Sequence, residues 1–213
     1  MDIISNFAVF EGGDGSGTTT QLSLLKERLK NSIKPVFFST FEPTDGQIGT
    51  LIRAALKKEI SLKPETLAML FAADRNEHLY GQDGVLERSG RGELVVSDRY
   101  VPSSLVYQGI ECGDELAASL NSRFPAPETL LFFDIEPEIA LKRLKGRPSS
   151  EIYEYRDFQE KVREKYKTFL GMYRDAGVRV AVIDASKTAE EVADLVWSEL
   201  SLMPIMKKSE NTP

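Results

Sequence analysis

The chain has 213 residues, of which 41% are hydrophobic and 28% are charged, and its formal net charge is −6. This composition predicts one globular domain with a buried core, and the acidic balance excludes the overall basic character typical of nucleic-acid-binding proteins. A single cysteine, Cys112, excludes an internal disulfide. No apolar run approaches the roughly 20 residues that a membrane-spanning helix needs. We therefore expect a soluble, cytoplasmic protein that binds neither membranes nor nucleic acids.

Short apolar segments alternate with longer amphipathic segments along the chain, which is the pattern of a parallel sheet covered by helices. The predicted strands are Phe7–Phe10, Val36–Ser39, Leu94–Ser97, Leu130–Asp134 and Val178–Ile183. The predicted helices are Thr19–Lys30, Ile48–Lys57, Pro64–Leu86, Asp114–Asn121, Glu138–Leu144, Phe158–Ala176 and Ala189–Leu200. Right-handed crossovers would place these helices on both faces of the sheet. The pattern predicts a three-layer α/β fold with a five-stranded parallel sheet.

Nothing in the sequence divides the chain into separate units, so residues 1–204 are expected to form one domain. Gly177 directly follows the long helical pattern of Phe158–Ala176, as glycine often does at the end of a helix. Residues 145–157, directly before that helix, could form a mobile flap. Residues 205–213 are expected to form a flexible tail.

A glycine-rich segment connects the first predicted strand to the first predicted helix. Gly12, Gly17 and Thr19 match the phosphate-loop pattern of Gly, four residues, Gly, Lys, and Ser or Thr. Glycines let backbone N–H groups converge on phosphate oxygens, and the following helix adds its positive end. The residues expected to bind ATP are Gly12, Gly13, Asp14, Gly15, Ser16, Gly17, Thr18, Thr19 and Thr20. The segment therefore predicts a P-loop.

Thr18 occupies the position of the phosphate-loop lysine. A threonine donates a hydrogen bond but carries no charge, so Thr18 cannot neutralise the ATP phosphates as lysine does. The hydroxyl of Thr19 stands where P-loops bind a magnesium ion. Either another cation replaces the lysine, or phosphoryl transfer is slow or absent.

Four further motifs follow in a fixed order. They are Glu42-Pro43-Thr44-Asp45-Gly46 with Arg53 shortly after it, Leu70-Phe71-Ala72-Ala73-Asp74-Arg75, Ser97-Asp98-Arg99-Tyr100 with Ser103-Ser104, and Tyr107-Gln108-Gly109. With the phosphate loop, this order makes the sequence resemble the thymidylate kinases, which transfer phosphate from ATP to dTMP. The resemblance extends from Phe7 to about Leu200. It implies a P-loop kinase fold with a small lid, Mg²⁺ as cofactor with ATP, and a homodimer.

Asp98 and Arg99 follow a predicted strand, at the end where open α/β sheets bind ligands. We expect Asp98 to hold Mg²⁺ together with Thr19, and the resemblance assigns Arg99 to the phosphate of dTMP. Phe71 and Arg75 are four residues apart and share one helix face. The resemblance implies that Phe71 stacks on thymine and that Arg75 contacts the base.

The resemblance also implies contacts to the sugar of dTMP. Asp14 matches a carboxylate that recognises the 3′-hydroxyl, and Tyr107 would crowd a ribose 2′-hydroxyl and so favour deoxyribose. The residues expected to bind dTMP are Asp14, Glu42, Arg53, Phe71, Arg75, Arg99, Ser104, Tyr107 and Gln108. Phe41 stands where many bacterial relatives have arginine, which removes one cation from this region.

Residues 142–157 lie where the family has its lid, and the basic residues there are Lys142, Arg143, Lys145, Arg147 and Arg156. Bacterial members without an arginine in the phosphate loop supply one from the lid. We expect Arg143 or Arg147 to replace the missing charge, so the expected catalytic residues are Asp14, Arg99, Arg143 and Arg147. Two alternatives remain open: a nucleotide-binding pseudo-kinase, and a kinase for another deoxynucleoside monophosphate.

Overall fold

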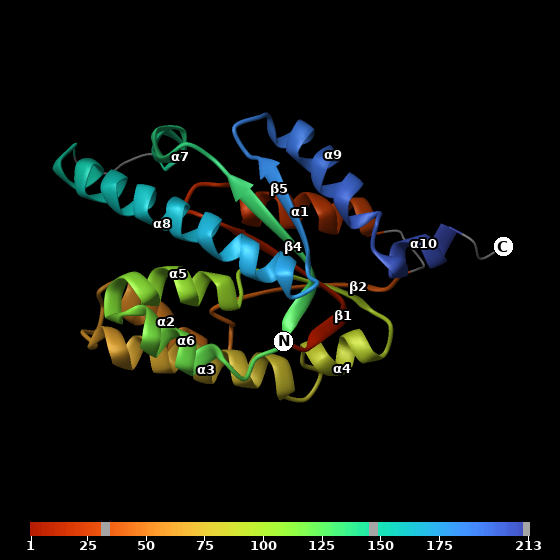
Figure 1. The fold of residues 1–213 in the computed structure, drawn as a ribbon, viewed down its shortest axis with the longest axis horizontal. Helices are drawn as coiled ribbons and strands as arrows, with labels where there is room; N and C mark the ends of the chain where they lie inside the picture. Colours follow the sequence, from red (N-terminus) through yellow and green to blue (C-terminus); the bar gives the residue numbers. More distant parts are fainter. Residues whose placement is uncertain (31–34, 145–148, 211–213) are drawn as a thin grey trace.

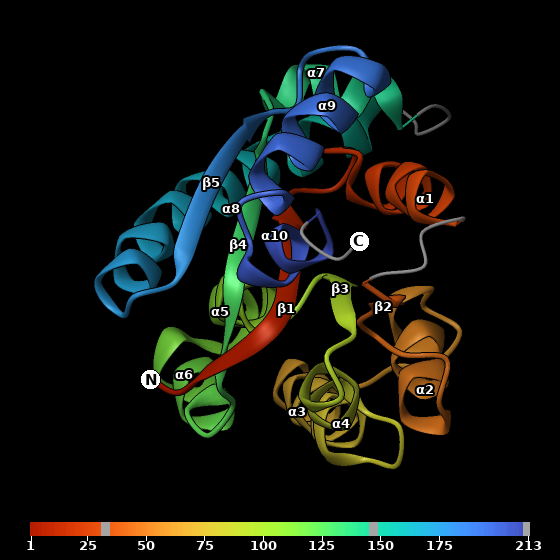
Figure 2. The ribbon, with the colours of Figure 1, turned by 90° about the vertical axis from the view of Figure 1, so that its right-hand side faces the viewer.

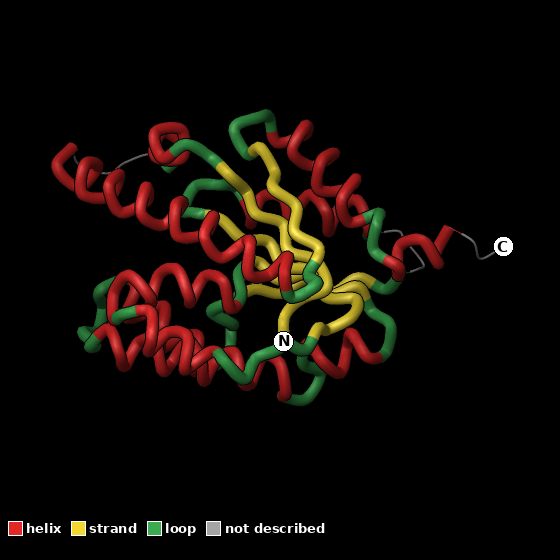
Figure 3. Tube along the Cα trace, viewed as in Figure 1, coloured by secondary structure: helices red, strands yellow, loops and turns green. Residues whose placement is uncertain are grey.

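The computed structural model describes residues 1–30, 35–144 and 149–210. Five parallel strands form one sheet in the order β2-β3-β1-β4-β5 within these residues. The strands are β1 (Ile3–Gly12), β2 (Phe37–Phe41), β3 (Leu94–Asp98), β4 (Ala126–Asp134) and β5 (Arg179–Asp184). Figure 3 shows the sheet in yellow between red helices. The predicted α/β fold with five parallel strands is confirmed.

Ten helices surround the sheet in the described part of the chain. They are α1 (Thr18–Leu29), α2 (Gln47–Leu56), α3 (Pro64–Tyr80), α4 (Val85–Gly90), α5 (Val101–Cys112), α6 (Asp114–Asn121), α7 (Pro137–Arg143), α8 (Ser149–Asp175), α9 (Ala189–Leu200) and α10 (Pro204–Glu210). Figures 1 and 2 show α2 to α6 gathered on one side of the molecule, and α1 and α9 on the other. Across the described ranges, each helix is too short or too polar to cross a lipid bilayer.

Successive side chains of β1 point into two separate cores. Phe7 and Val9 pack with buried residues of α3, α4, α5 and α8, whereas Ala8 and Phe10 pack with buried residues of α1 and α9. All four side chains are fully buried. A strand covered on both faces carries apolar residues in succession, which explains the apolar run Phe7–Phe10 within β1. The sheet is therefore the middle of three layers.

The predicted helix Pro64–Leu86 is two helices, α3 and α4. Gly81 is extended, and an added Cβ there would lie 2.5 Å from the carbonyl oxygen of Glu77. Asp83 adopts a left-handed φ of 55° in the connecting turn. These local conformations are incompatible with a continuous helix, so the prediction was wrong at this point. The turn residues Gly81, Asp83 and Gly84 were the available signal.

Helix α5 was missing from the predicted elements, although it begins with a proline in its first turn. Helix α8 begins at Ser149, nine residues before the predicted start at Phe158, and so includes the end of the expected lid. Residues 145–148 of that segment lie outside the described ranges. The predicted end of this helix is confirmed, because Gly177 follows it with a left-handed φ of 89°.

The C-terminal segment differs from the expected flexible tail. Helix α10 covers Pro204–Glu210, and the side chains of Met203 and Met206 are buried. Both methionines belong to the core beneath α1 and α9. Residues 211–213 lie outside the described ranges. Met203 and Met206, near the C-terminal end of the described residues, thus contribute to this core.

This packing predicts that Met206→Ala lowers the free energy of unfolding by about 2 kcal/mol, because truncating a buried methionine removes apolar contacts and leaves a cavity. Urea denaturation measures the change. Leu202→Ala is the matched control, since Leu202 is 41% exposed and should shift stability by less than about 0.5 kcal/mol. Equal, small effects for both variants would show that α10 is not anchored in the core.

Candidate functional site

The glycine-rich segment forms a tight turn from β1 into α1. Gly15 and Gly17 have left-handed φ values of 80° and 93°, which favour glycine. An added Cβ on Gly15 would lie 2.7 Å from the carbonyl oxygen of Ala140. The backbone N–H of Ser16 donates to the carbonyl of Gly13 at 3.2 Å. The turn therefore places backbone N–H groups and the N-terminus of α1 at one point, as an anion site requires.

A cavity of about 370 Å³ lies over this turn. Its lining residues are Gly13, Asp14, Gly15, Gly17, Thr18, Thr19, Thr20, Arg99, Leu144 and Tyr155. Arg99 is the one cationic side chain among the described residues of this lining. Thr18 is buried, with 6% of its surface exposed. Among these described lining residues, positive charge therefore comes from Arg99, directly after β3.

Thr19, in the first turn of α1, lies beside Asp98 at the end of β3. The hydroxyl of Thr19 donates to Oδ2 of Asp98 at 2.5 Å. The other carboxylate oxygen of Asp98 is buried and has no hydrogen-bond partner among the described residues. A hydroxyl and a free carboxylate oxygen are hard oxygen donors, and Mg²⁺ prefers such donors. The pair therefore fits the predicted metal site.

A second cavity, of about 350 Å³, adjoins the first. Its lining residues are Asp14, Glu42, Pro43, Leu56, Phe71, Arg75, Arg99, Tyr100, Ser103, Ser104, Tyr107, Gln108, Glu111 and Phe158. Asp14 and Arg99 line both cavities. Phe71, Leu56 and Phe158 supply apolar surface from three different helices. The arrangement suits a flat apolar ring with polar groups at its edge.

The floor of this second cavity is a buried ion pair. Arg75 is 1% exposed, and its Nε and Nη2 donate to Oε2 of Glu42 at 2.9 and 2.7 Å. Nη2 also donates to the hydroxyl of Ser104 at 3.0 Å, and Nη1 donates to the side chain of Asn121. Burial opposes ionisation of Glu42, but the charge of Arg75 and a hydrogen bond from His78 outweigh it and hold the pKa of this carboxyl below its usual value.

His78 is a site residue that the sequence patterns did not identify as functional. Its Nδ1 lies 2.9 Å from Oε1 of Glu42, and its Nε2 lies 2.7 Å from the hydroxyl of Thr40. Its side chain is 7% exposed. The available signal was its spacing, because His78 stands three residues after Arg75 on the same helix face. It holds the Glu42 carboxylate beneath the cavity.

Asp14 receives hydrogen bonds from three other parts of the chain: Arg99 after β3, helix α5 and helix α8. Its Oδ1 accepts from Nη2 of Arg99 at 2.8 Å and from the hydroxyl of Tyr107 at 3.2 Å. Its Oδ2 accepts from the hydroxyl of Tyr155 at 2.7 Å and from Nε2 of Gln159 at 3.4 Å. Tyr155 and Gln159 lie on α8 and were not predicted. The phosphate loop is thereby tied to both α5 and α8.

Two predicted site residues lie elsewhere, and a third is not described. Arg53 donates to the carbonyls of Pro43 and Thr44 at 2.8 and 2.6 Å and does not line the second cavity. Arg143 lies 3.3 Å from the carbonyl of Lys187 and lines a separate cavity of about 290 Å³ on the other side of the loop. The third residue, predicted at position 147, lies outside the described ranges. The structure brings the remaining predicted residues together around the turn and the two cavities.

The strand–turn–helix unit, which includes Thr19, lies beside Asp98 at the carboxyl edge of the sheet. Together they define a P-loop nucleotide-binding protein with a second ligand pocket next to its phosphate site.

Comparison with known proteins identifies the family. The family model described as Thymidylate kinase matches residues 10–196. A protein of Treponema pallidum (strain Nichols) is 43% identical over 203 residues, which cover 94% of this chain and 97% of that protein. Relatives from Pyrobaculum aerophilum and Aeropyrum pernix are 41% and 38% identical, over 88% and 90% of this chain and 92% and 96% of their own lengths. All three are named as thymidylate kinases, with qualifiers that mark the names as inferred. The chain belongs to the thymidylate kinase family.

The buried ion pair predicts a large effect of Glu42→Gln on stability. The change leaves the guanidinium of Arg75 buried without its carboxylate, and removal of one partner of a buried pair costs about 3–5 kcal/mol. Urea denaturation should show a fall of this size in the free energy of unfolding. Glu27→Gln is the control, because it breaks an exposed ion pair with Lys30 worth less than about 1 kcal/mol. A loss of that small size for Glu42→Gln would contradict a buried, charged pair.

Proposed function

We propose that this protein is a dTMP kinase, an ATP-dependent enzyme that forms dTDP and ADP and serves dTTP synthesis. One observation carries the proposal: Asp14 and Arg99 line both the phosphate-loop cavity and the cavity that contains Phe71 and Arg75. A donor phosphate and an acceptor nucleotide bound in these cavities would meet at Arg99. Membership of the thymidylate kinase family supports the same assignment.

Donor binding is proposed to depend on the backbone of residues 12–20. Their N–H groups would surround the ATP phosphates, and Thr19 and Asp98 would hold Mg²⁺. The bound metal ion would neutralise part of the phosphate charge. Arg99 would hold the phosphate of dTMP in line with the γ-phosphoryl group. The reaction needs positioning and charge neutralisation and no covalent enzyme intermediate.

Acceptor binding is proposed to depend on the second cavity. Phe71 would stack on thymine above the floor formed by Arg75, and Gln108 and Ser104 would complete the base and sugar pocket. Asp14 would accept a hydrogen bond from the sugar 3′-hydroxyl. Burial raises the pKa of the Tyr107 hydroxyl to about 12, so this group stays protonated and donates to Asp14. In this position the Tyr107 side chain would also crowd, and so exclude, a ribose 2′-hydroxyl.

The charge missing at Thr18 is proposed to come mainly from Arg99, which lines the donor cavity. Arg143 lines a neighbouring cavity together with Lys187 and Thr188, a position that suits contact with the nucleoside end of ATP. A catalytic role for Arg147, and a lid over residues 142–157, are proposed from the family resemblance alone. Two cores that share one sheet support a single domain for residues 1–204.

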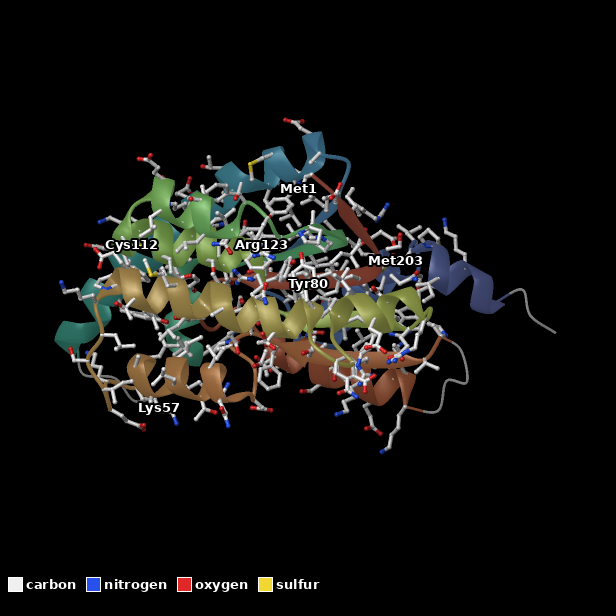
Figure 4. The ribbon with its side chains drawn as sticks, turned by 90° about the horizontal axis from the view of Figure 1, so that it is seen from below. Met1, Lys57, Tyr80, Cys112, Arg123 and Met203 are labelled. Carbon is white, nitrogen blue, oxygen red and sulfur yellow. The ribbon has the colours of Figure 1, made fainter. Side chains whose placement is uncertain are left out.

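A homodimer and a cytoplasmic location are also proposed from the family resemblance. Figure 4 shows α2 and α3 side by side on one face of the molecule. Leu51 and Leu56 of α2 and Met69 of α3 are 43%, 53% and 53% exposed. These apolar side chains support the proposal that this face packs against a second subunit.

The function predicts that ADP release, in a coupled assay with ATP and Mg²⁺, is fastest with dTMP among the nucleoside monophosphates. Phe71→Ala should raise the KM for dTMP about 10- to 100-fold, because base stacking on an aromatic ring contributes about 1–3 kcal/mol. Leu195→Ala, which changes a side chain of α9 that is 37% exposed, is the control. Binding of dTMP without turnover would support the pseudo-kinase, and faster turnover of another monophosphate would redefine the acceptor.

A second variant separates two roles for Arg143. If Arg143 contacts the nucleoside end of ATP, Arg143→Ala should raise the KM for ATP about tenfold, the loss expected for about 1.4 kcal/mol, and leave dTMP binding unchanged. If Arg143 instead replaces the lysine charge, kcat should fall by about 100-fold, the loss expected for one electrostatic donor. Thr18→Lys measured alongside shows whether charge in the loop limits turnover.

A further inference from the structure

The carboxylate of Glu11, at the end of β1, lines neither cavity and is fully buried. Its Oε1 accepts from the backbone N–H groups of Tyr100 and Ser103 at 2.8 and 3.3 Å. The first N–H groups of a helix lack partners within the helix, so Glu11 satisfies the start of α5 from outside it. Its Oε2 accepts from the hydroxyls of Ser103 and Tyr166 at 2.6 and 2.8 Å.

Ser103 connects this carboxylate to Arg99. The hydroxyl of Ser103 donates to Glu11 and accepts from Nη1 of Arg99 at 3.3 Å. Arg99 has a left-handed φ of 72°, which is uncommon for a residue with a side chain. Its backbone N–H donates to the carbonyl of Phe10 at 2.9 Å. The conformation of Arg99 is therefore fixed at its backbone by β1, and its guanidinium is held by Ser103 at Nη1 and by Asp14 at Nη2.

The ionised form of Glu11 is the form that fits these contacts. Burial raises the pKa of its carboxyl to about 7, while the hydrogen bond from Ser103, the charge of Arg99 and the hydrogen bond from Tyr166 favour the carboxylate. A carboxylate accepts through both oxygens and donates through neither. All four donor hydrogens can therefore point at the Glu11 oxygens only while the carboxylate is charged.

We propose that Glu11 is a positioning residue for phosphoryl transfer: through Ser103 and the start of α5, it holds the guanidinium of Arg99 at the boundary between the donor and acceptor cavities. The proposal rests on the proposed dTMP kinase function. Glu11 acts through Arg99, because Arg99 lines both cavities and Glu11 lines neither. A displaced guanidinium would misalign the two phosphates, and a misplacement of about 1 Å can cost about 100-fold in rate.

Glu11→Gln tests this at pH 8, where Glu11 is mostly ionised in the unchanged protein. The variant keeps the side-chain size but replaces one acceptor with an amide N–H₂ that donates, so Ser103 must turn its proton away. We expect kcat to fall about 10- to 100-fold. Affinity for thymidine, which lacks the phosphate, should stay within about twofold, because the base and sugar pocket is unchanged. In the Arg99→Ala background, Glu11→Gln should cause no further loss of kcat.

Thr129→Val is the matched control, because Thr129 is also fully buried on the sheet and its hydroxyl has no partner among the described residues. It should keep the kcat of the unchanged protein. A folded Glu11→Gln variant with unchanged kcat would overturn the proposal. An equal loss of kcat from Glu11→Gln in the presence and in the absence of the Arg99 side chain would also overturn it, since that result indicates a general structural role.

Ser103→Ala keeps the proposal testable if Glu11→Gln does not fold. This change leaves the Glu11 carboxylate in place and removes the Ser103 hydroxyl that connects it to Arg99. The same fall in kcat is expected. An unchanged kcat would contradict a role for this connection. If the unchanged protein transfers no phosphate to dTMP, the proposed function fails. The affinity for dTMP relative to that for thymidine then tests the positioning role of Glu11, because a displaced Arg99 should weaken the binding of dTMP and leave the binding of thymidine unchanged.

Discussion

The ion pair between Asp14 and Arg99 determines how the two cavities meet. The residues come from different strand ends, Asp14 from the loop after β1 and Arg99 from the end of β3, and Nη2 of Arg99 lies 2.8 Å from Oδ1 of Asp14. The two strands are neighbours with parallel register, so their carboxyl ends lie at the same edge of the sheet. The side chains are 24% and 40% exposed, and such a pair contributes little to stability. Its importance is geometric, because it aligns both ligand sites on one pair of side chains.

Two helices that pack against each other, α5 and α8, complete this geometry. Helix α5 supplies Tyr107, and α8 supplies Tyr155 and Gln159, all of which donate to Asp14. The later turns of α8 are embedded in the core, where Tyr166 is fully buried. Because α8 contacts both the core and the phosphate loop, a shift of its first turns would alter the acceptor site directly. The long helix therefore couples the interior of the domain to the site.

The sequence was sufficient where the relevant pattern is local. The apolar strands, the glycine-rich turn and the i, i+4 pair of Phe71 and Arg75 follow from short spacings, and each lies where the patterns placed it. Contacts between distant segments were not predictable in this way. Asp14 and Gln159 are 145 positions apart, and their hydrogen bond depends on how α8 packs on the sheet.

The incorrect expectations have two physical origins, one in a local turn and one in the packing of distant segments. The break between α3 and α4 results from a local turn whose glycines and aspartate were absorbed into an amphipathic pattern. The family resemblance assigns Arg53 to the ligand, and in the structure its guanidinium donates to the carbonyls of the Pro43–Thr44 turn, of which Pro43 lines the second cavity. A charged side chain near a motif has several possible partners, and only the three-dimensional packing selects among them. Burial of Met206 likewise depends on a core formed by distant helices.

The hydrogen bonds that Arg75 already makes within the protein affect the thermodynamics of ligand binding. A guanidinium has five N–H donors, and contacts to Glu42, Ser104 and Asn121 use four of them. One N–H of Nη1 is left for a ligand carbonyl. Because these hydrogen bonds already hold the side chain in the folded protein, its rotamer entropy, about 2 kcal/mol for arginine, is lost on folding rather than on association. A ligand that contacts Arg75 would therefore meet a side chain whose conformation is already ordered by folding.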